Sequence, residues 1–238
     1  AFEGKADQRS ALEKALDADA SVGVALTEVA HAGAYLLREG AGQLLLLQRE
    51  TDLLIQGAGL GGGADQAAQA LLPALRQVAQ WERTLGLRNP ATAMDVTLVD
   101  FHFAERLPGA GEHVYPGEDL VLDLVKTGGD WVEIRGAIRA RSRMAQTLHL
   151  ALVYFSREFG IHILSNDPVE PGGGWATLWG AKPEDYFFLD DGQNESVERF
   201  KLIVSTERID DFLLSQDDLA LGQIVSPTRG VQREDGTR

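Results

Sequence analysis

The stretch that decides the fold is WVEIRGAIRARSRMAQTLHLALVYFSREFGIHIL, residues 131–164. Apolar and polar side chains alternate along it, and a period of two is typical of a strand with one buried and one exposed face. A short turn at 156–159 separates the last two apolar segments. The stretch therefore predicts three consecutive antiparallel strands. We expect the core residues to be Leu148, Leu150, Leu152, Ile161 and Ile163.

The residues before this stretch predict a small sheet and a helix. Segments within 22–55 alternate as strands do, with a hairpin turn at 40–42. A glycine cluster at 57–63 precedes a long apolar stripe at helical spacing, which ends near Gly86. Pro73 lies inside that stripe and requires either a kink or a helix that begins close to it. One long amphipathic helix is therefore expected in this region.

From Met94 onward, short alternating segments follow one another, including 96–101, 120–125, 175–179 and 200–206. Many short strands separated by turns are typical of an antiparallel sandwich. We therefore predict an α+β fold that is predominantly an antiparallel β-sandwich. Residues 1–92 would form an N-terminal α/β part with the glycine-rich connector and the long helix. Residues 93–226 would form the β-sandwich domain, and residues 227–238 a flexible tail.

The composition restricts the class of protein. A net charge of -14 disfavours nucleic acid and anionic membranes as partners. No apolar run is long enough to span a bilayer. The absence of cysteine excludes disulfides and thiolate chemistry within the chain and fits a cytoplasmic location. The first residue is alanine, as in a chain cut from a longer protein.

Gly57, Gly59 and Gly62 have the spacing of a dinucleotide-binding turn between a strand and a helix. Backbone amides at a helix N-terminus could bind a pyrophosphate there. The acidic residue expected about 20 positions later is missing, and five glycines in seven residues match the spacing easily. We prefer a flexible connector and keep nucleotide binding as the alternative.

Other catalytic patterns are weak. The five histidines show no zinc-ligand spacing, and no Gly-x-Ser-x-Gly motif occurs. We therefore expect no metal and no cofactor, with a hydrolase of unfamiliar type as a further alternative.

Four arginines are the concentrated positive feature of this acidic chain. Arg135, Arg139, Arg141 and Arg143 share one parity and should lie on one face of a strand. We expect internal pairing with the acidic residues of 207–218. A surface for a protein partner or a phosphorylated ligand is the alternative.

Trp175, Trp179 and Tyr186 lie close together in the sequence, beside Gly172–Gly174. An aromatic-lined ligand pocket is one interpretation. Closure of one end of the core by these rings is the other.

Several phrases resemble the β-rich region that follows the peptidase domain in caspase-like (metacaspase-type) proteins of bacteria and fungi. They lie at 75–81, 87–90, 154–161 and, most clearly, in FKLIVST at 200–206 with DFLL at 211–214 behind it. The catalytic His/Cys pair of that family has no counterpart, because the chain has no cysteine. The resemblance therefore implies a non-catalytic domain beside a peptidase. We expect a recognition or regulatory domain with a protein partner, such as a caspase-like peptidase domain.

Overall fold

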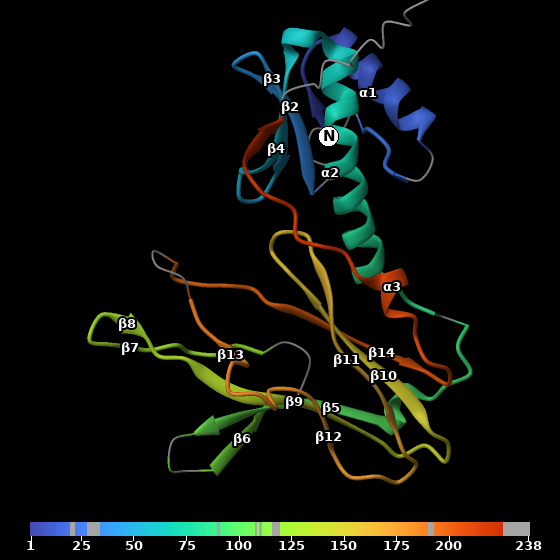
Figure 1. Cartoon of the computed structure of the whole chain (residues 1–238), viewed down its shortest axis with the longest axis vertical. Helices are drawn as coiled ribbons and strands as arrows, with labels where there is room; N and C mark the ends of the chain where they lie inside the picture. The colour runs from blue at the N-terminus through green and yellow to red at the C-terminus, as the bar shows by residue number, and fades with distance from the viewer. Residues whose placement is uncertain are drawn as a thin grey trace, which may run out of the picture. The chain divides into compact units, whose positions relative to one another are not determined.

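The computed structural model describes residues 1–19, 22–27, 34–89, 91–107, 109, 111–115, 120–189 and 193–225. The fold is α+β and mostly strand. It divides into two compact units (Figure 1). Unit 1 comprises Ala1–Gly86 and the segment from Asp218 onward, and unit 2 comprises Leu87–Asp217. This division differs from the predicted 1–92, 93–226 and 227–238, because the chain returns to unit 1 near its C-terminal end. The predicted tail lies outside the described residues.

Unit 1 is one sheet with two helices. The sheet has the order β1-β2-β3-β4-β15, and only its two outer pairs, β1 with β2 and β4 with β15, are parallel. The predicted turn at 40–42 joins β2 to β3, with Ala41 and Gly42 both at positive φ. The elements are β1 (Phe2–Glu3), α1 (Ala6–Ala18), β2 (Tyr35–Gly40), β3 (Gln43–Gln48), β4 (Leu53–Gly59), the 3-10 turn η1 (Leu60–Gly62), α2 (Ala64–Leu85) and β15 (Gln223–Val225).

Helix α2 begins directly after the glycine cluster and runs for 22 residues. Its apolar residues, among them Leu71, Leu75 and Val78, are buried. Pro73 lies within this helix and is exposed. Because that position faces solvent, water can bind the carbonyl oxygen that the missing proline N–H leaves free. The helix therefore needs no new start near Pro73.

Unit 2 contains two principal antiparallel sheets, β11-β10-β14 and β12-β9-β5-β6, and β13 also pairs with β9. A short hairpin, β7 with β8, turns through Gly128 and Gly129. The elements are the 3-10 turn η2 (Val96–Leu98), β5 (Val99–Leu107), β6 (Gly111–Tyr115), β7 (Lys126–Thr127), β8 (Asp130–Trp131), β9 (Ile134–Ser142), β10 (Leu148–Phe155), β11 (Ile161–Val169), β12 (Ala176–Trp179), β13 (Tyr186–Phe187), β14 (Arg199–Ser205) and α3 (Asp211–Leu214).

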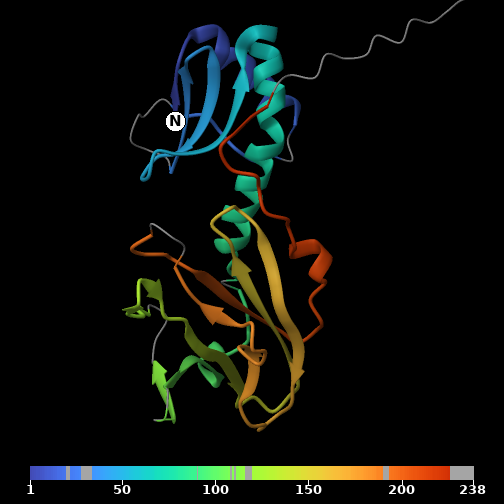
Figure 2. The ribbon, with the colours of Figure 1, turned by 60° about the vertical axis from the view of Figure 1, so that its left-hand side comes forward.

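Side chains from both principal sheets form one apolar cluster, and Figures 1 and 2 show the backbone of these two sheets. Leu148, Leu150 and Leu152 of β10 are fully buried in it, as predicted. Ile161 is buried, whereas Ile163 is only partly buried. A bulge at Leu152/Val153 shifts the pairing of β10 with β11 by one residue, so Ile161 and Ile163 lie opposite Phe155 and Val153 and not opposite the core leucines. The three predicted strands of 131–164 are β9, β10 and β11, but they do not form one consecutive antiparallel sheet: β10 pairs with β11, whereas β9 belongs to the other principal sheet and pairs with β5.

Two further segments differ from the sequence prediction. Residues 96–98 form a 3-10 turn instead of a strand, and β5 then places Phe101 and Phe103 against the core while Asp100 lies on the other face. Residues 120–124 are irregular, although Leu122 and Leu124 do pack against the core cluster. These two leucines alternate with their neighbours as buried residues of a strand do, but alternation in the sequence does not show whether a partner strand exists.

Candidate binding site

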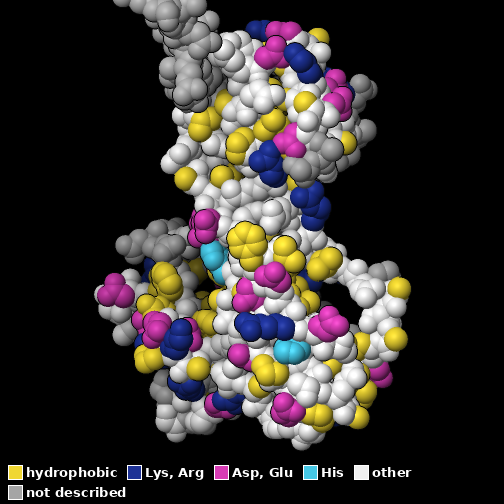
Figure 3. Space-filling view, turned by 45° about the vertical axis from the view of Figure 1, so that its right-hand side comes forward, with side chains coloured by type: hydrophobic (Ala, Val, Ile, Leu, Met, Phe, Trp, Pro, Cys, Tyr) yellow, Lys and Arg dark blue, Asp and Glu magenta, His cyan; other side chains and the backbone are white. Residues whose placement is uncertain are grey.

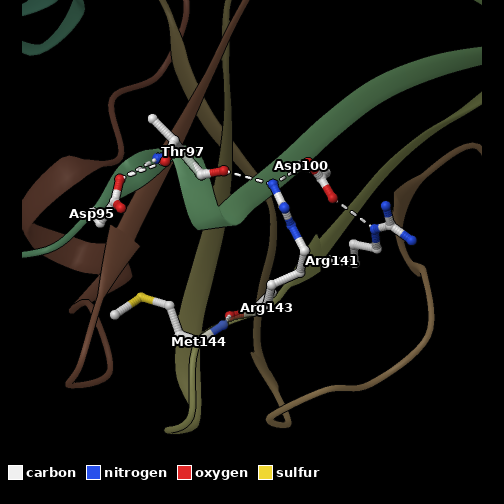
Figure 4. Close-up of polar contacts among 7 residues, drawn as sticks. Asp95, Thr97, Asp100, Arg141, Arg143 and Met144 are labelled. Atoms are coloured by element: carbon white, nitrogen blue, oxygen red, sulfur yellow. Dashed lines mark hydrogen bonds and ion pairs between the residues drawn. The ribbon is translucent and has the colours of Figure 1, made fainter.

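The arginine row lies on the face of β9 that points away from the core cluster. Asp100 of β5 stands directly opposite Arg141 of β9 in the sheet register. Its carboxylate accepts a hydrogen bond from Arg141 Nε at 2.7 Å and one from Arg143 Nη2 at 3.1 Å (Figure 4). Arg143 Nη2 also donates to the carbonyl oxygen of Thr97 at 2.7 Å. One carboxylate therefore holds two of the four guanidinium groups.

The other two arginines are also paired within unit 2. Arg139 donates two hydrogen bonds to the carboxylate of Glu112 on β6, at 2.7 and 2.6 Å. Arg135 donates to Glu133 at 2.7 Å and to the carbonyl oxygen of Pro183 at 2.8 Å. Hydrogen bonds from the guanidinium groups hold the pKa of Asp100 and of Glu112 below their ordinary values.

Internal pairing of the arginine row therefore occurs, but with other carboxylates than the sequence suggested. None of the acidic residues of 207–218 contacts these arginines within the described part of the chain. The actual partners lie on neighbouring strands, and sequence parity alone could not show which strands are neighbours. On the face displayed in Figure 3, side chains of both charge signs are intermingled, and no large area of one sign is visible. The row gives little support for a charged docking surface.

The three aromatic residues predicted to line one pocket are separated by the structure. Trp175 lies over Arg141, 4.6 Å from its guanidinium carbon, and against the ring of His102, on the arginine face. Trp179 points to the core side, with its ring 4.9 Å from that of Phe187. A bulge between Thr177 and Trp179 reverses the parity and places the two tryptophans on opposite faces.

Tyr186, the third of these residues, also lies outside the core. Its ring is 5.5 Å from the guanidinium carbon of Arg135 and 5.7 Å from the ring of Phe188. The next residue, Phe187, faces the core cluster instead. Because neighbouring residues of a strand point to opposite faces, only one of the pair can line a cavity between the sheets.

An aromatic cavity of about 630 Å³ does exist in unit 2, next to the core cluster. We call it the aromatic cavity. Its volume lies in the range of small-molecule and side-chain binding sites. Six aromatic residues form much of its wall, and they come from β5, β6, β8, β13 and β14. These residues are Phe101, Phe103, Tyr115, Trp131, Phe187 and Phe200, with Phe188 at 55% exposure beside them.

Carboxylates are the charged groups of this wall. Asp123, Glu195 and Glu198 line the cavity, and the described lining contains no lysine or arginine. Tyr115 donates its hydroxyl hydrogen to Glu105 Oε2 at 2.5 Å. This hydrogen bond, together with burial and the negative charge of Glu105 and Asp123, raises the pKa of Tyr115 to about 12. Tyr115 is therefore neutral at physiological pH.

Sequence reasoning missed the aromatic cavity because its residues are far apart in the chain. In β14, Phe200, Leu202 and Val204 alternate with other residues as one face of a strand does, and all three pack against the core cluster. Alternation within 96–101 did not show which of its two parities faces the core, so Phe101 and Phe103 were not expected inside. A correct register for β5 would have identified two of the six aromatic residues.

The glycine cluster has a packing function in unit 1. Gly57 and Gly59 belong to β4, and Gly62 ends the turn η1 before α2. A Cβ atom on Gly57 would lie 2.5 Å from Ile224 Cδ1 and 2.9 Å from Leu45 Cδ2. A Cβ at position 57 would displace the ends of these two side chains, so their packing favours glycine there without any nucleotide. The sheet beside it is mainly antiparallel, whereas a dinucleotide-binding fold has a parallel sheet.

Among the described residues, no group of three or more His, Asp and Glu side chains is placed to hold a metal ion. Within the same residues, no helix is long and apolar enough to cross a membrane. Comparison of the chain with models of known families, with curated proteins and with solved structures finds no match.

Proposed function

We propose that unit 2 is a non-catalytic recognition domain that binds an apolar group of a protein partner in the aromatic cavity. The observation that carries this proposal is the cavity itself. Aromatic rings provide a large apolar contact area with little conformational freedom to lose, which favours binding of a partner. The arginine row, in contrast, is occupied by its own carboxylates.

The exposed surface around the aromatic cavity supports a protein as the partner. Val121 and Val197 line the cavity and are 82% and 60% exposed, and Phe188 is 55% exposed. Apolar side chains gathered at the edge of a cavity are typical of protein interaction sites. The ligand surface therefore extends beyond the enclosed volume.

Three more specific statements belong to the same proposal. The two principal sheets of unit 2 would form a β-sandwich, with the cavity between them. The partner would be a caspase-like peptidase domain, as the resemblance of residues 200–214 implies, and unit 2 would regulate it. The pair would act in the cytoplasm. Copurification of the chain with such a peptidase domain from the same organism would test the identity of the partner.

The binding function can be tested with a neutral apolar probe, N-phenyl-1-naphthylamine, whose fluorescence rises in apolar surroundings. Two valines provide a matched pair of variants, because Val197 and Val125 are both 60% exposed but only Val197 lines the aromatic cavity. We expect the probe to bind the unmodified chain. Val197→Asp should weaken binding about fivefold, since it replaces partly buried apolar area by a charge. Val125→Asp should leave the affinity unchanged.

Absence of probe binding by the unmodified chain would contradict the proposal. Equal loss of affinity in the two valine variants would contradict it as well, because the probe would then bind elsewhere.

A further inference from the structure

Two groups of carboxylates in unit 2 differ in their partners. Asp100, Glu112 and Glu133 each form an ion pair with an arginine of β9. The three carboxylates that line the aromatic cavity, Asp123, Glu195 and Glu198, have no lysine or arginine at ion-pair distance within the described chain. The carboxylates of the arginine face are therefore paired with cations, whereas the three that line the cavity are not paired within the described residues.

Glu198 is held in place by neutral donors. Tyr154 donates its hydroxyl hydrogen to Glu198 Oε2 at 2.7 Å, and Ser196 Oγ donates to Oε1 at 2.5 Å. Both carboxylate oxygens are thus oriented while the full negative charge remains. A fixed carboxylate without a cation favours a positively charged ligand, because the orientation costs no further entropy on binding.

The aromatic wall adds a second contribution for a cation. Ring faces carry partial negative charge and attract ammonium and guanidinium groups. The chain contains an example at the wall itself, where Lys126 Nζ lies 4.3 Å from the centre of the Trp131 ring. Lys126 does not line the cavity. Carboxylates and aromatic faces therefore favour the same charge sign in the ligand.

We infer that the aromatic cavity binds a peptide segment of a partner protein in which an apolar side chain stands beside lysine or arginine. The apolar side chain fills the volume between the rings. The cationic side chain lies over the lining carboxylates Asp123, Glu195 and Glu198. A peptide fits better than a free amine, because the exposed apolar residues Val121, Phe188 and Val197 extend the contact surface beyond the cavity. This inference rests on the proposed function.

Short blocked peptides test the chemistry directly. The probes are acetyl-Gly-Lys-Phe-Lys-Gly-amide, the same peptide with Glu in place of both Lys, and the same peptide with Ala in place of Phe. Phenethylamine serves as a free amine. Each is titrated into the full chain, and its affinity is measured by displacement of the neutral probe and by calorimetry.

Two double variants isolate the role of the carboxylates. Asp123→Asn with Glu195→Gln removes two charges from the cavity wall, at side chains with no described hydrogen bond to lose. Glu158→Gln with Asp167→Asn is the matched control, since both are exposed, lie outside the lining and change the net charge equally. We expect the Lys-Phe-Lys peptide to lose about fivefold in affinity with the first variant, as for two partly screened ion pairs. Less than twofold should be lost with the control.

The neutral probe separates this inference from the proposed function, because it tests the cavity of the unmodified chain without a charged group: probe binding without any preference for the Lys-Phe-Lys peptide would overturn this inference alone. Strong binding of the Lys-Phe-Lys peptide, with weak binding of the other two peptides and of phenethylamine, would support the inference. Equal binding of the Glu-Phe-Glu peptide, or equal loss in both double variants, would overturn the role of the carboxylates. Equal binding of the Lys-Ala-Lys peptide would contradict the role of the apolar side chain. Equal binding of phenethylamine would contradict the inference that the ligand is a peptide segment.

Discussion

Replacement of Gly136 by alanine should destabilise unit 2 through close contacts with two residues, Phe103 and Ala104. Gly136 lies in β9, where a Cβ atom would stand 2.4 and 2.5 Å from two ring carbons of Phe103 and 2.7 Å from the carbonyl oxygen of Ala104. Non-bonded carbon atoms normally lie 3.5–4.0 Å apart. The ring would therefore have to move by about 1 Å within a packed core. Overpacking of this kind costs about 2–3 kcal/mol in the free energy of unfolding.

Phe103 also lines the aromatic cavity, so the same substitution should affect binding. Displacement of its ring by the new methyl group would alter the wall and weaken binding of the neutral apolar probe. Urea denaturation followed by tryptophan fluorescence measures the stability, because three of the four tryptophans lie in unit 2. Gly174→Ala is the control, since no atom lies within 4 Å of its Cβ position and its φ is not positive.

A second variant makes the prediction specific. Phe103→Leu removes the ring carbons that the new Cβ would meet, so Gly136→Ala should cost clearly less in a Phe103→Leu background than alone. Equal shifts of the denaturation midpoint in Gly136→Ala and Gly174→Ala would contradict the close packing of Phe103 in β5 against Gly136 in β9.

Two further predictions concern the arginine face. Arg139→Glu and Glu112→Arg should each lower the free energy of unfolding, and the double exchange should recover part of the loss. A double-mutant cycle measured by thermal denaturation should give a coupling energy of about 0.5–1 kcal/mol between the two residues. A coupling energy of zero would contradict the bidentate pair. Folding lowers the pKa of Asp100 and of Glu112, so the unfolded chain binds more protons than the folded chain at acidic pH. The stability that these two groups add is therefore present above about pH 5 and is lost as the pH falls towards about 3. Thermal melts of Asp100→Asn/Glu112→Gln should therefore depend less on pH in this window than melts of the unmodified chain, and equal dependence would refute the assignment.

Local patterns predicted the elements better than their partners. Alternation correctly separated the arginines of β9 from Ile134, Ile138 and Ala140, because a strand between a core and solvent sorts its side chains by polarity. Alternation also identified Leu148, Leu150 and Leu152 as core. Neither result depends on which strand lies next to which.

What could not be predicted depends on single inserted residues and on strand order. The bulge in β12 sends Trp179 inward although Trp175, at the same parity, faces outward. A bulge also shifts the register between β10 and β11, so Ile163 lies opposite Val153 and not opposite a core leucine, and the turn at 96–98 precedes β5, in which Phe101 and Phe103 face the core. Sequence alternation carries no mark of such insertions, so each one moves every following side chain to the other face. The aromatic cavity combines residues from across this rearranged register and was therefore missed.

The return of the chain to β4 affects the order in which the molecule can be completed. Strands β1 to β4 leave the ribosome before any part of unit 2, whereas β15, which pairs with β4, is made after all of it. During synthesis, the edge of β4 thus remains without its last strand, and its backbone groups stay available to other chains. Truncation before Gln223 would make that interim state permanent. Ribosome-bound or truncated chains should therefore recruit chaperones through unit 1 even after unit 2 has folded.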